Sequence, residues 1–150
     1  MAEIKYVHTN LIARDWKKLA KFYIDVFGCK EKKPDRNLKG QWLDDLTGIK
    51  DARIKGIHLL LPGYDENGPT LEIFQYNENE KNTNKKINVE GLGHTAFAVD
   101  DVDRCLANVI KNGGSTVGKL VKGTVEGVGE IYVVYAKDPE GNIIELQKWD

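Results

Sequence analysis

Four residues of the chain combine metal-binding side chains with a repeated order along the sequence. In chain order they are His8, Glu72, His94 and Glu145. The two histidines are 86 residues apart and the two glutamates 73 residues apart, as expected of two related halves of which the first has the longer middle. Imidazole nitrogen and carboxylate oxygen together suit divalent Zn, Ni, Co, Mn or Fe. The order therefore predicts one divalent-metal site with ligands from both halves, and an octahedral ion would keep two positions for water or substrate.

Each of these residues also has a structural interpretation. A single histidine is more often a core or rim residue than a ligand, Glu72 could be a partly exposed strand residue, and Glu145 could pair with Lys148. However, both glutamates stand alone between apolar neighbours on strands that we expect to be buried. A buried carboxylate costs several kcal/mol unless it is paired or bound to a metal. The repetition in both halves favours the metal site.

Two further polar residues lie close to these candidates in the sequence pattern. Side chains in a strand alternate between faces, so Asn10 shares a face with His8 and is a candidate substrate contact. His58 lies in the apolar stretch GIHLLLP and has no repeated partner in the second half. We therefore interpret His58 as a structural residue.

The elements that must position the candidates follow the same order in both halves. YVHTNLIA predicts a strand, Asp15 is a plausible N-cap, and the next residues show a helical apolar period that ends at Gly28. In the second half GHTAFAV predicts a strand, and Asp100 or Asp101 caps a similar helix. Each half ends in strand-like segments, TLEIFQY in the first and NIIELQKW in the second. The pattern predicts an α+β fold in which each half is a strand, a helix and several strands.

The chain has the length of one compact domain with an internal repeat. Residues 31–55 have weak periodicity, and we expect an irregular strand and a loop there. The stretch NENEKNTNKKINVE is polar and reads as a solvated linker. We predict a single domain over residues 1–150, with module one at about 1–78, the linker at about 79–88 and module two at about 89–150.

Composition excludes several classes of partner and location. The 22 basic and 23 acidic residues nearly cancel, so no excess positive charge is available for a nucleic-acid backbone. Apolar runs are far shorter than the roughly 20 residues that span a bilayer, and the first residues lack the pattern of a secretion signal. Cys29 and Cys105 lie in apolar contexts and read as free thiols of a reducing compartment. We expect a cytoplasmic protein without nucleic-acid or membrane partners.

Several stretches resemble the vicinal oxygen chelate superfamily, which includes glyoxalase I, methylmalonyl-CoA epimerase, extradiol dioxygenases, and fosfomycin and bleomycin resistance proteins. They are HTNLIARDWKKLAKFYIDVFG, PTLEIFQYN, GLGHTAFAVDDVD and KDPEGNIIELQ, and together with the intervening segments they span nearly the whole chain. The resemblance implies two βαβββ modules whose curved sheets enclose a metal-lined cavity. It also implies a homodimer.

Within that superfamily the ligand pattern resembles the four-ligand glyoxalase I and epimerase branch. Dioxygenases and fosfomycin transferases use the positions of His8, His94 and Glu145, and this chain adds Glu72. In contrast, the arginine and asparagine of the glutathione-dependent glyoxalases are replaced here by Ile12 and Tyr76. Glutathione is therefore not indicated as the thiol carrier.

The resemblance implies a lyase or isomerase that acts on a small molecule by proton transfer next to a carbonyl, through a metal-stabilised enediolate. Glu145, or in second place Glu72, would act as the general base. Two alternatives stay open at this point. One is an Fe(II)-dependent extradiol-type dioxygenase, and the other is a non-catalytic small-molecule binding or resistance protein.

Overall fold

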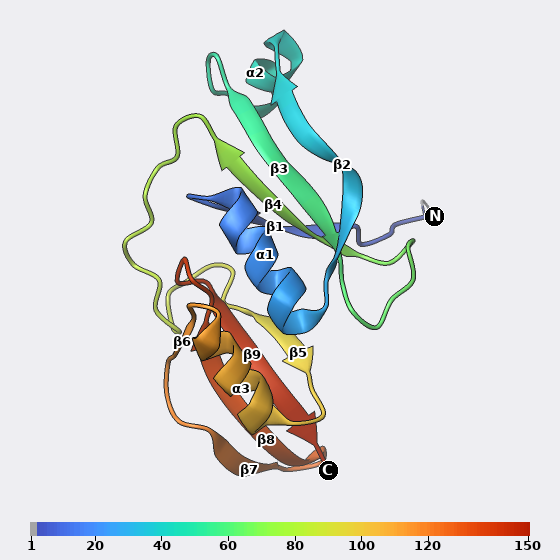
Figure 1. The fold of residues 1–150 in the computed structure, drawn as a ribbon, viewed down its shortest axis with the longest axis vertical. Helices are drawn as coiled ribbons and strands as arrows, with labels where there is room; N and C mark the ends of the chain where they lie inside the picture. Colours follow the sequence, from blue (N-terminus) through green and yellow to red (C-terminus); the bar gives the residue numbers. More distant parts are fainter. Residues whose placement is uncertain (1–2) are drawn as a thin grey trace. The chain divides into compact units, whose positions relative to one another are not determined.

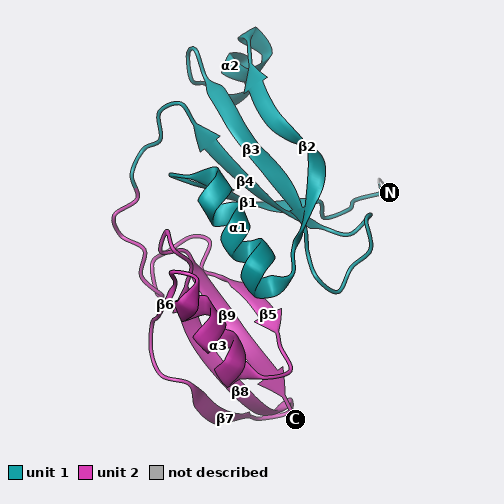
Figure 2. Ribbon diagram, in the orientation of Figure 1, with its two compact units in different colours: residues 1–81 teal, residues 82–150 magenta. Residues whose placement is uncertain are grey.

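Two units of similar construction make up the chain, Met1–Lys81 and Asn82–Asp150 (Figure 2). The structure is a computed structural model that describes residues 3–150. The division between the units falls within the polar stretch that the sequence marks as a linker.

Unit 1 is a four-stranded sheet with one long and one short helix (Figure 1). Its elements are β1 (His8–Ile12), α1 (Trp16–Phe27), β2 (Lys30–Lys39), α2 (Gln41–Thr47), β3 (Arg53–Leu60) and β4 (Thr70–Tyr76). The strand order is β1-β4-β3-β2, with β1 parallel to β4 and the other neighbours antiparallel. The first and last strands of the unit are thus side by side, although about sixty residues separate them.

Within unit 1, helix α1 covers one face of this sheet. The other face, called the open face here, is covered at one end by helix α2, whose Leu43 packs on Ile54. The start of α1 is capped by Asp15, whose side chain accepts a hydrogen bond from the Lys18 amide at 3.1 Å, and Gly28 ends α1 in the left-handed conformation that glycine adopts without strain. The helix packs on β3 and β4, where alternate residues such as Ile57 and Ile73 are fully buried. Because side chains alternate along a strand, the residues between them point to the opposite face. That open face carries the candidate site.

Unit 2 repeats this arrangement with a divided edge strand. Its elements are β5 (Thr95–Ala98), α3 (Val102–Lys111), β6 (Ser115–Thr116), β7 (Val121–Val125), β8 (Gly129–Lys137) and β9 (Ile143–Trp149). The order is β5-β9-β8-β6, and β7 also pairs with β8. Strands β6 and β7 together therefore take the place in unit 2 that β2 has in unit 1.

The strand registers of the two units match residue by residue. Asn10 pairs with Glu72 in unit 1, and Ala96 pairs with Glu145 in unit 2. The residue opposite Glu72 on the next strand is His58, and that opposite Glu145 is Tyr135 (register Tyr135↔Glu145). The predicted α+β fold of two repeated strand-helix-strand modules is confirmed.

The segment with weak periodicity, residues 31–55, contains more regular structure than the sequence predicts. It holds most of the ten-residue strand β2 and the whole of helix α2. Helix α2 buries one side chain, Leu43, in a small cluster with Ala52 and Ile54, so its sequence carries almost no apolar period. No helix among residues 3–150 is long and apolar enough to cross a membrane.

Candidate metal centre

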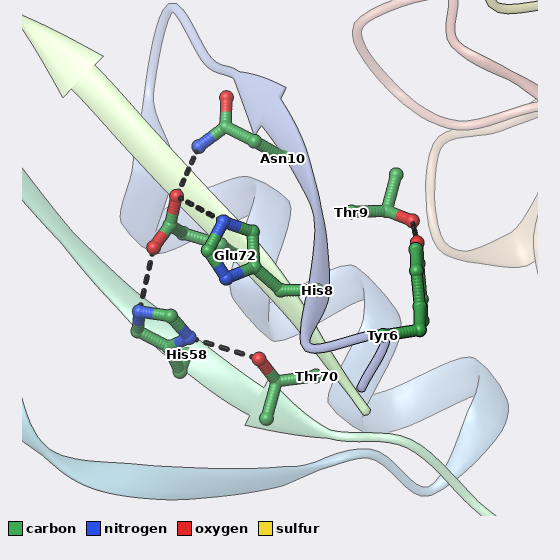
Figure 3. Close-up of polar contacts among 7 residues, drawn as sticks. All are labelled: Tyr6, His8, Thr9, Asn10, His58, Thr70 and Glu72. Carbon is green, nitrogen blue, oxygen red and sulfur yellow. Dashed lines mark hydrogen bonds and ion pairs between the residues drawn. The ribbon is translucent and has the colours of Figure 1, made fainter. Parts of the chain in front are cut away.

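The register of unit 1 gathers four polar residues on the open face of its sheet (Figure 3). Glu72 lies in the middle of β4, between its strand partners Asn10 on β1 and His58 on β3. His8 is two residues before Asn10 and therefore shares its face. Residues from three strands, far apart in the sequence, thus point toward one carboxylate.

The Glu72 carboxylate is buried and receives polar groups on both oxygens. Only 8% of the residue is exposed. Asn10 Nδ2 donates to Oε1 at 2.7 Å, and His8 Nε2 lies 3.4 Å from the same oxygen. His58 Nε2 lies 2.6 Å from Oε2. These contacts fix the orientation of the carboxylate, which satisfies the requirement that a buried charge be hydrogen-bonded.

His58 is the partner that sequence analysis missed as a candidate ligand. Burial lowers its pKa below the usual value, an effect that the positive charges of Arg36 and Lys32 and the neighbouring His8 reinforce and that Glu72 opposes. The imidazole is therefore neutral at pH 7 and carries one N–H. Its Nδ1 lies 2.9 Å from Thr70 Oγ1. A hydroxyl donates as well as accepts, so this contact suits either tautomer, including the one that leaves Nε2 unprotonated for a metal.

Three of these side chains have the composition and spacing of a metal site. The ligand atoms offered by His8, His58 and Glu72 all lie within 4.8 Å of one another. Adjacent ligands of an ion with bonds of about 2.1 Å lie about 3 Å apart, close to the His8–Glu72 and His58–Glu72 separations given above. Two imidazoles and one carboxylate suit Zn, Mn, Fe, Co or Ni. The donor set fits a divalent ion.

Unit 2 places its own histidine and glutamate in the same relation. His94 Nε2 lies 3.2 Å from Glu145 Oε2, and both side chains are partly buried. The ring of Tyr135 contacts that of His94, with centroids 5.0 Å apart, as the His58 ring does with His8 at 5.4 Å. The two units therefore share a His-Glu pair and differ in the aromatic residue beside it.

The structure brings the four predicted ligands together as two pairs, one in each unit. His8 lies against Glu72, and His94 against Glu145. The binding of one ion by all four side chains stays a prediction. Asn10, predicted to contact substrate, holds the Glu72 carboxylate in place, and its contact with substrate also stays a prediction.

A signal for His58 was present in the sequence. It is the one ring nitrogen donor within an otherwise apolar strand pattern, and alternation from the buried Ile57 and Leu59 places it on the open face. Placing it opposite Glu72 requires the pairing of β3 with β4, which the sequence pattern does not specify.

Comparison with known proteins gives the family and the fold. The family model described as Glyoxalase/Bleomycin resistance protein/Dioxygenase superfamily matches residues 5–146. No curated protein matches the chain. A glyoxalase family protein from Bacillus cereus has a similar structure, with a TM-score of 0.74, 18% identity, and coverage of 99% of this chain and 95% of its own.

A second similar structure is the fosfomycin resistance protein FosX from Listeria monocytogenes. Its TM-score is 0.59 at 15% identity, covering all of this chain and 95% of its own. A variant of that protein complexed with Mn(II) and dihydroxypropylphosphonic acid also has a TM-score of 0.59, at 17% identity, with coverage of 97% and 93%. At these identities the likeness shows a shared fold.

Proposed function

Because the chain belongs to the Glyoxalase/Bleomycin resistance protein/Dioxygenase superfamily, we propose that it is a divalent-metal-dependent enzyme that acts on a small molecule. More narrowly, we propose a lyase or isomerase that moves a proton next to a carbonyl group. The observation that carries this proposal is the pair of equivalent His-Glu contacts, one in each unit, at matched register positions. A duplicated pair of metal-binding side chains is difficult to explain by packing alone.

The proposed ligands are those of the two pairs, His8, Glu72, His94 and Glu145. His58 is a further candidate, since its Nε2 already lies against the Glu72 carboxylate. The donor types support a divalent ion, and the Listeria protein of similar fold was crystallised with Mn(II). A bound ion would act as a Lewis acid on two adjacent substrate oxygens and make the neighbouring C–H more acidic.

The two glutamates differ in how firmly their carboxylates are held. Glu72 accepts from Asn10 and contacts both His8 and His58, whereas the contact identified for Glu145 is with His94. A general base must approach the C–H proton and then return it. We therefore propose Glu145 as the base and Glu72 as the more fixed ligand, with Glu72 the second candidate for the base.

The proposal is tested by solvent exchange at the substrate carbon. Metal-loaded full-length protein is incubated in deuterium oxide with 2-oxoaldehyde thiohemiacetals and with acyl-CoA thioesters, and deuterium is followed by mass spectrometry. We expect exchange in the wild type and its loss in Glu145→Gln, measured at a metal concentration high enough to keep the variant loaded. The exposed Glu130→Gln variant should exchange as the wild type does. Metal-bound protein that exchanges none of these substrates would refute the reaction, and oxygen uptake on catechols by iron-loaded protein would favour the dioxygenase instead.

Metal stoichiometry tests the ligand set separately from the reaction. One ion per chain, lost in both His8→Ala and His94→Ala, is expected if the two pairs bind the same ion. Two ions per chain would instead support a separate centre in each unit. One ion whose binding survives His94→Ala would support a centre formed by His8, His58 and Glu72 alone. The same preparation tests the predicted homodimer, which should sediment with twice the mass of one chain.

A further inference from the structure

Strand β2 places two cations on the open face of unit 1, beside the candidate metal centre. Lys32 is the strand partner of His58, and Arg36 is the partner of Gly56. Cross-strand partners project to the same side of a sheet, so both cations share the face of His58 and Glu72. A bulge between Lys32 and Arg36 takes up the intervening residues.

The other charged residues of this part of β2 form ion pairs with one another. Lys33 Nζ lies 3.1 Å from Glu31 Oε2 and 2.8 Å from Asp35 Oδ1. The two acidic residues next to the bulge thus share one lysine. They are not the partners of the two cations on the site face.

Lys32 and Arg36 make contacts of a different kind. Lys32 Nζ donates to the backbone carbonyl of Glu66 at 3.4 Å, and the Arg36 guanidinium donates to the carbonyl of Pro34. Within the described residues 3–150, no salt bridge joins either side chain to a carboxylate. Arg36 is nevertheless half-buried. Two cations without an anionic partner on one face leave a positive field there.

Both cations lie next to the candidate centre in the strand register. Lys32 is paired directly with His58, and Arg36 is paired with Gly56, two residues before His58 on β3. Between Arg36 and β4 the surface is apolar, because Phe74 lies against Gly56: a Cβ at Gly56 would be 2.7 Å from Phe74 Cδ1. The Phe74 ring also lies beside His58, with centroids 6.1 Å apart. On this face Lys32 therefore lies next to His58, and Arg36 lies next to the position where the apolar Phe74 ring covers Gly56.

Unit 2 lacks these cations at the equivalent positions. Val121 pairs with Val133, the counterpart of Gly56, and so matches Arg36. The Val117 amide donates to the Tyr135 carbonyl at 3.0 Å, which places Val117 at the position of Lys32. The same backbone arrangement thus carries valines in one unit and cations in the other, so the fold does not require the cations.

We infer that the substrate of this site carries an anionic group, a carboxylate or a phosphonate, that Arg36 and Lys32 bind. The inference rests on the proposed function, since it places the reacting end of the same molecule at the His8–Glu72 side. Strands lie about 4.8 Å apart, so β2 is about 10 Å from β4, a span that a short aliphatic chain and two long side chains can bridge. The planar arginine fork matches carboxylate and phosphonate oxygens, and lysine adds a point charge.

A matched pair of probes tests this inference. Succinic monohydroxamate offers two adjacent oxygens to a metal and ends in a carboxylate, and its primary amide analogue is neutral at that end. Binding of both to the Mn(II)-loaded full-length protein is measured by titration calorimetry at fixed ionic strength. We expect the acid to bind about tenfold tighter than the amide or more, as a charge-assisted contact predicts. Arg36→Gln and Lys32→Gln should each remove most of that preference and leave Mn(II) affinity unchanged.

Two residues of β3 provide controls of the same charge change. Arg53→Gln and Lys55→Gln remove cations that alternate with Ile54 and lie on the other face of the sheet, and they should leave the preference intact. Equal binding of acid and amide by the wild type would overturn the inference. An equal loss of the preference for the acid in Arg53→Gln and Lys55→Gln would also overturn it. So would loss of Mn(II) binding in both Arg36→Gln and Lys32→Gln. If the wild type binds neither Mn(II) nor Zn, Fe, Co or Ni, the proposed function fails. The acid is then titrated into the metal-free chain, where an affinity dependent on Arg36 still supports the anion site and the absence of such an affinity refutes it.

Discussion

Replacing Glu72 by glutamine separates two roles of this side chain, holding its neighbours and binding a cation. In the native arrangement Asn10 Nδ2 donates to Oε1 at 2.7 Å and His58 Nε2 contacts Oε2 at 2.6 Å. Glutamine has the same shape, so its amide oxygen can accept from Asn10. Its amide nitrogen can donate to His58 Nε2 if His58 carries its proton on Nδ1 and donates it to the Thr70 hydroxyl, 2.9 Å away. The hydrogen-bond network therefore survives without its charge.

The structure gives the size of the effect on the metal-free protein. Two hydrogen bonds change from charge-assisted to neutral, at a cost of about 1 kcal/mol each. The cost of burying a carboxylate is removed at the same time, and this offsets part of the loss. We expect the free energy of unfolding to fall by about 1 kcal/mol or less, which corresponds to a shift of about 2–4 °C in Tm for a chain of this length.

The effect on the metal-bound protein should be larger. An ion present at a hundred times its Kd adds about 2.7 kcal/mol to the stability of a protein that binds it only when folded. Residues that merely orient a ligand change metal affinity by about 10–100-fold, so loss of a carboxylate ligand should cost about a hundredfold or more. At the same metal concentration the added stability then falls to about 0.4 kcal/mol or less.

Urea unfolding of the wild type and of Glu72→Gln, each with and without Mn(II) or Zn(II), measures both quantities. Glu130→Gln removes an exposed carboxylate paired with Lys122 and should keep the metal-induced stabilisation. A Glu72→Gln variant that is stabilised by metal as much as the wild type would refute Glu72 as a ligand. If Glu72→Gln lowers the free energy of unfolding of the metal-free protein by more than about 4 kcal/mol, the arrangement in which His58 carries its proton on Nδ1 and accepts from the introduced glutamine would be refuted.

Three further predictions concern the fold. Gly56→Ala places a Cβ 2.0 Å from the Ile73 carbonyl oxygen and should lower the free energy of unfolding by about 2 kcal/mol or more in urea titration. In the control Gly118→Ala the added Cβ has no atom within 4 Å, so the free energy of unfolding should change by less than about 1 kcal/mol. Asp101→Ala removes the N-cap that accepts from the Arg104 amide at 2.9 Å and should cost about 1 kcal/mol in the same assay. Burial raises the pKa of the Cys29 thiol to about 11, so at pH 8 about one molecule in a thousand carries the reactive thiolate. A thiol-disulfide reagent should therefore modify Cys29 only after unfolding. Rapid modification of Cys29 in the folded protein would contradict this prediction.

The repeated modules could be predicted because local signals agree with the fold. The apolar period changes from two to 3.6 after the same kind of capping aspartate in both halves, and the observed caps are Asp15 and Asp101. Helix α2 could not be predicted in this way. Its single buried residue, Leu43, packs on Ala52 and Ile54, so the contact that supports it lies outside the helix.

His8 could be placed with Glu72 because the order of histidine and glutamate is repeated in the second half. His58 has no such repeat, and its contact with Glu72 could be found only from the register of β3 with β4. The pairing of Leu60 with Thr70 across the loop sets that register. A slip of one residue would move His58 to the face covered by α1, because side chains alternate along a strand. Composition and spacing do not determine such a slip, which is why the interpretation of His58 as structural was incomplete.

The two units together separate what the fold requires from what is particular to one half. Both keep a histidine and a glutamate in contact at the same register. Around that pair, unit 1 has the polar or charged residues Asn10, His58, Lys32 and Arg36. At the equivalent positions, in the same order, unit 2 has an alanine, a tyrosine and two valines. Since the backbone pairing is the same, the difference lies in side-chain chemistry. Under the functions proposed above, each unit supplies metal ligands and unit 1 alone recognises substrate charge, so exchanging its two cations for valines should abolish the anion preference while metal binding persists.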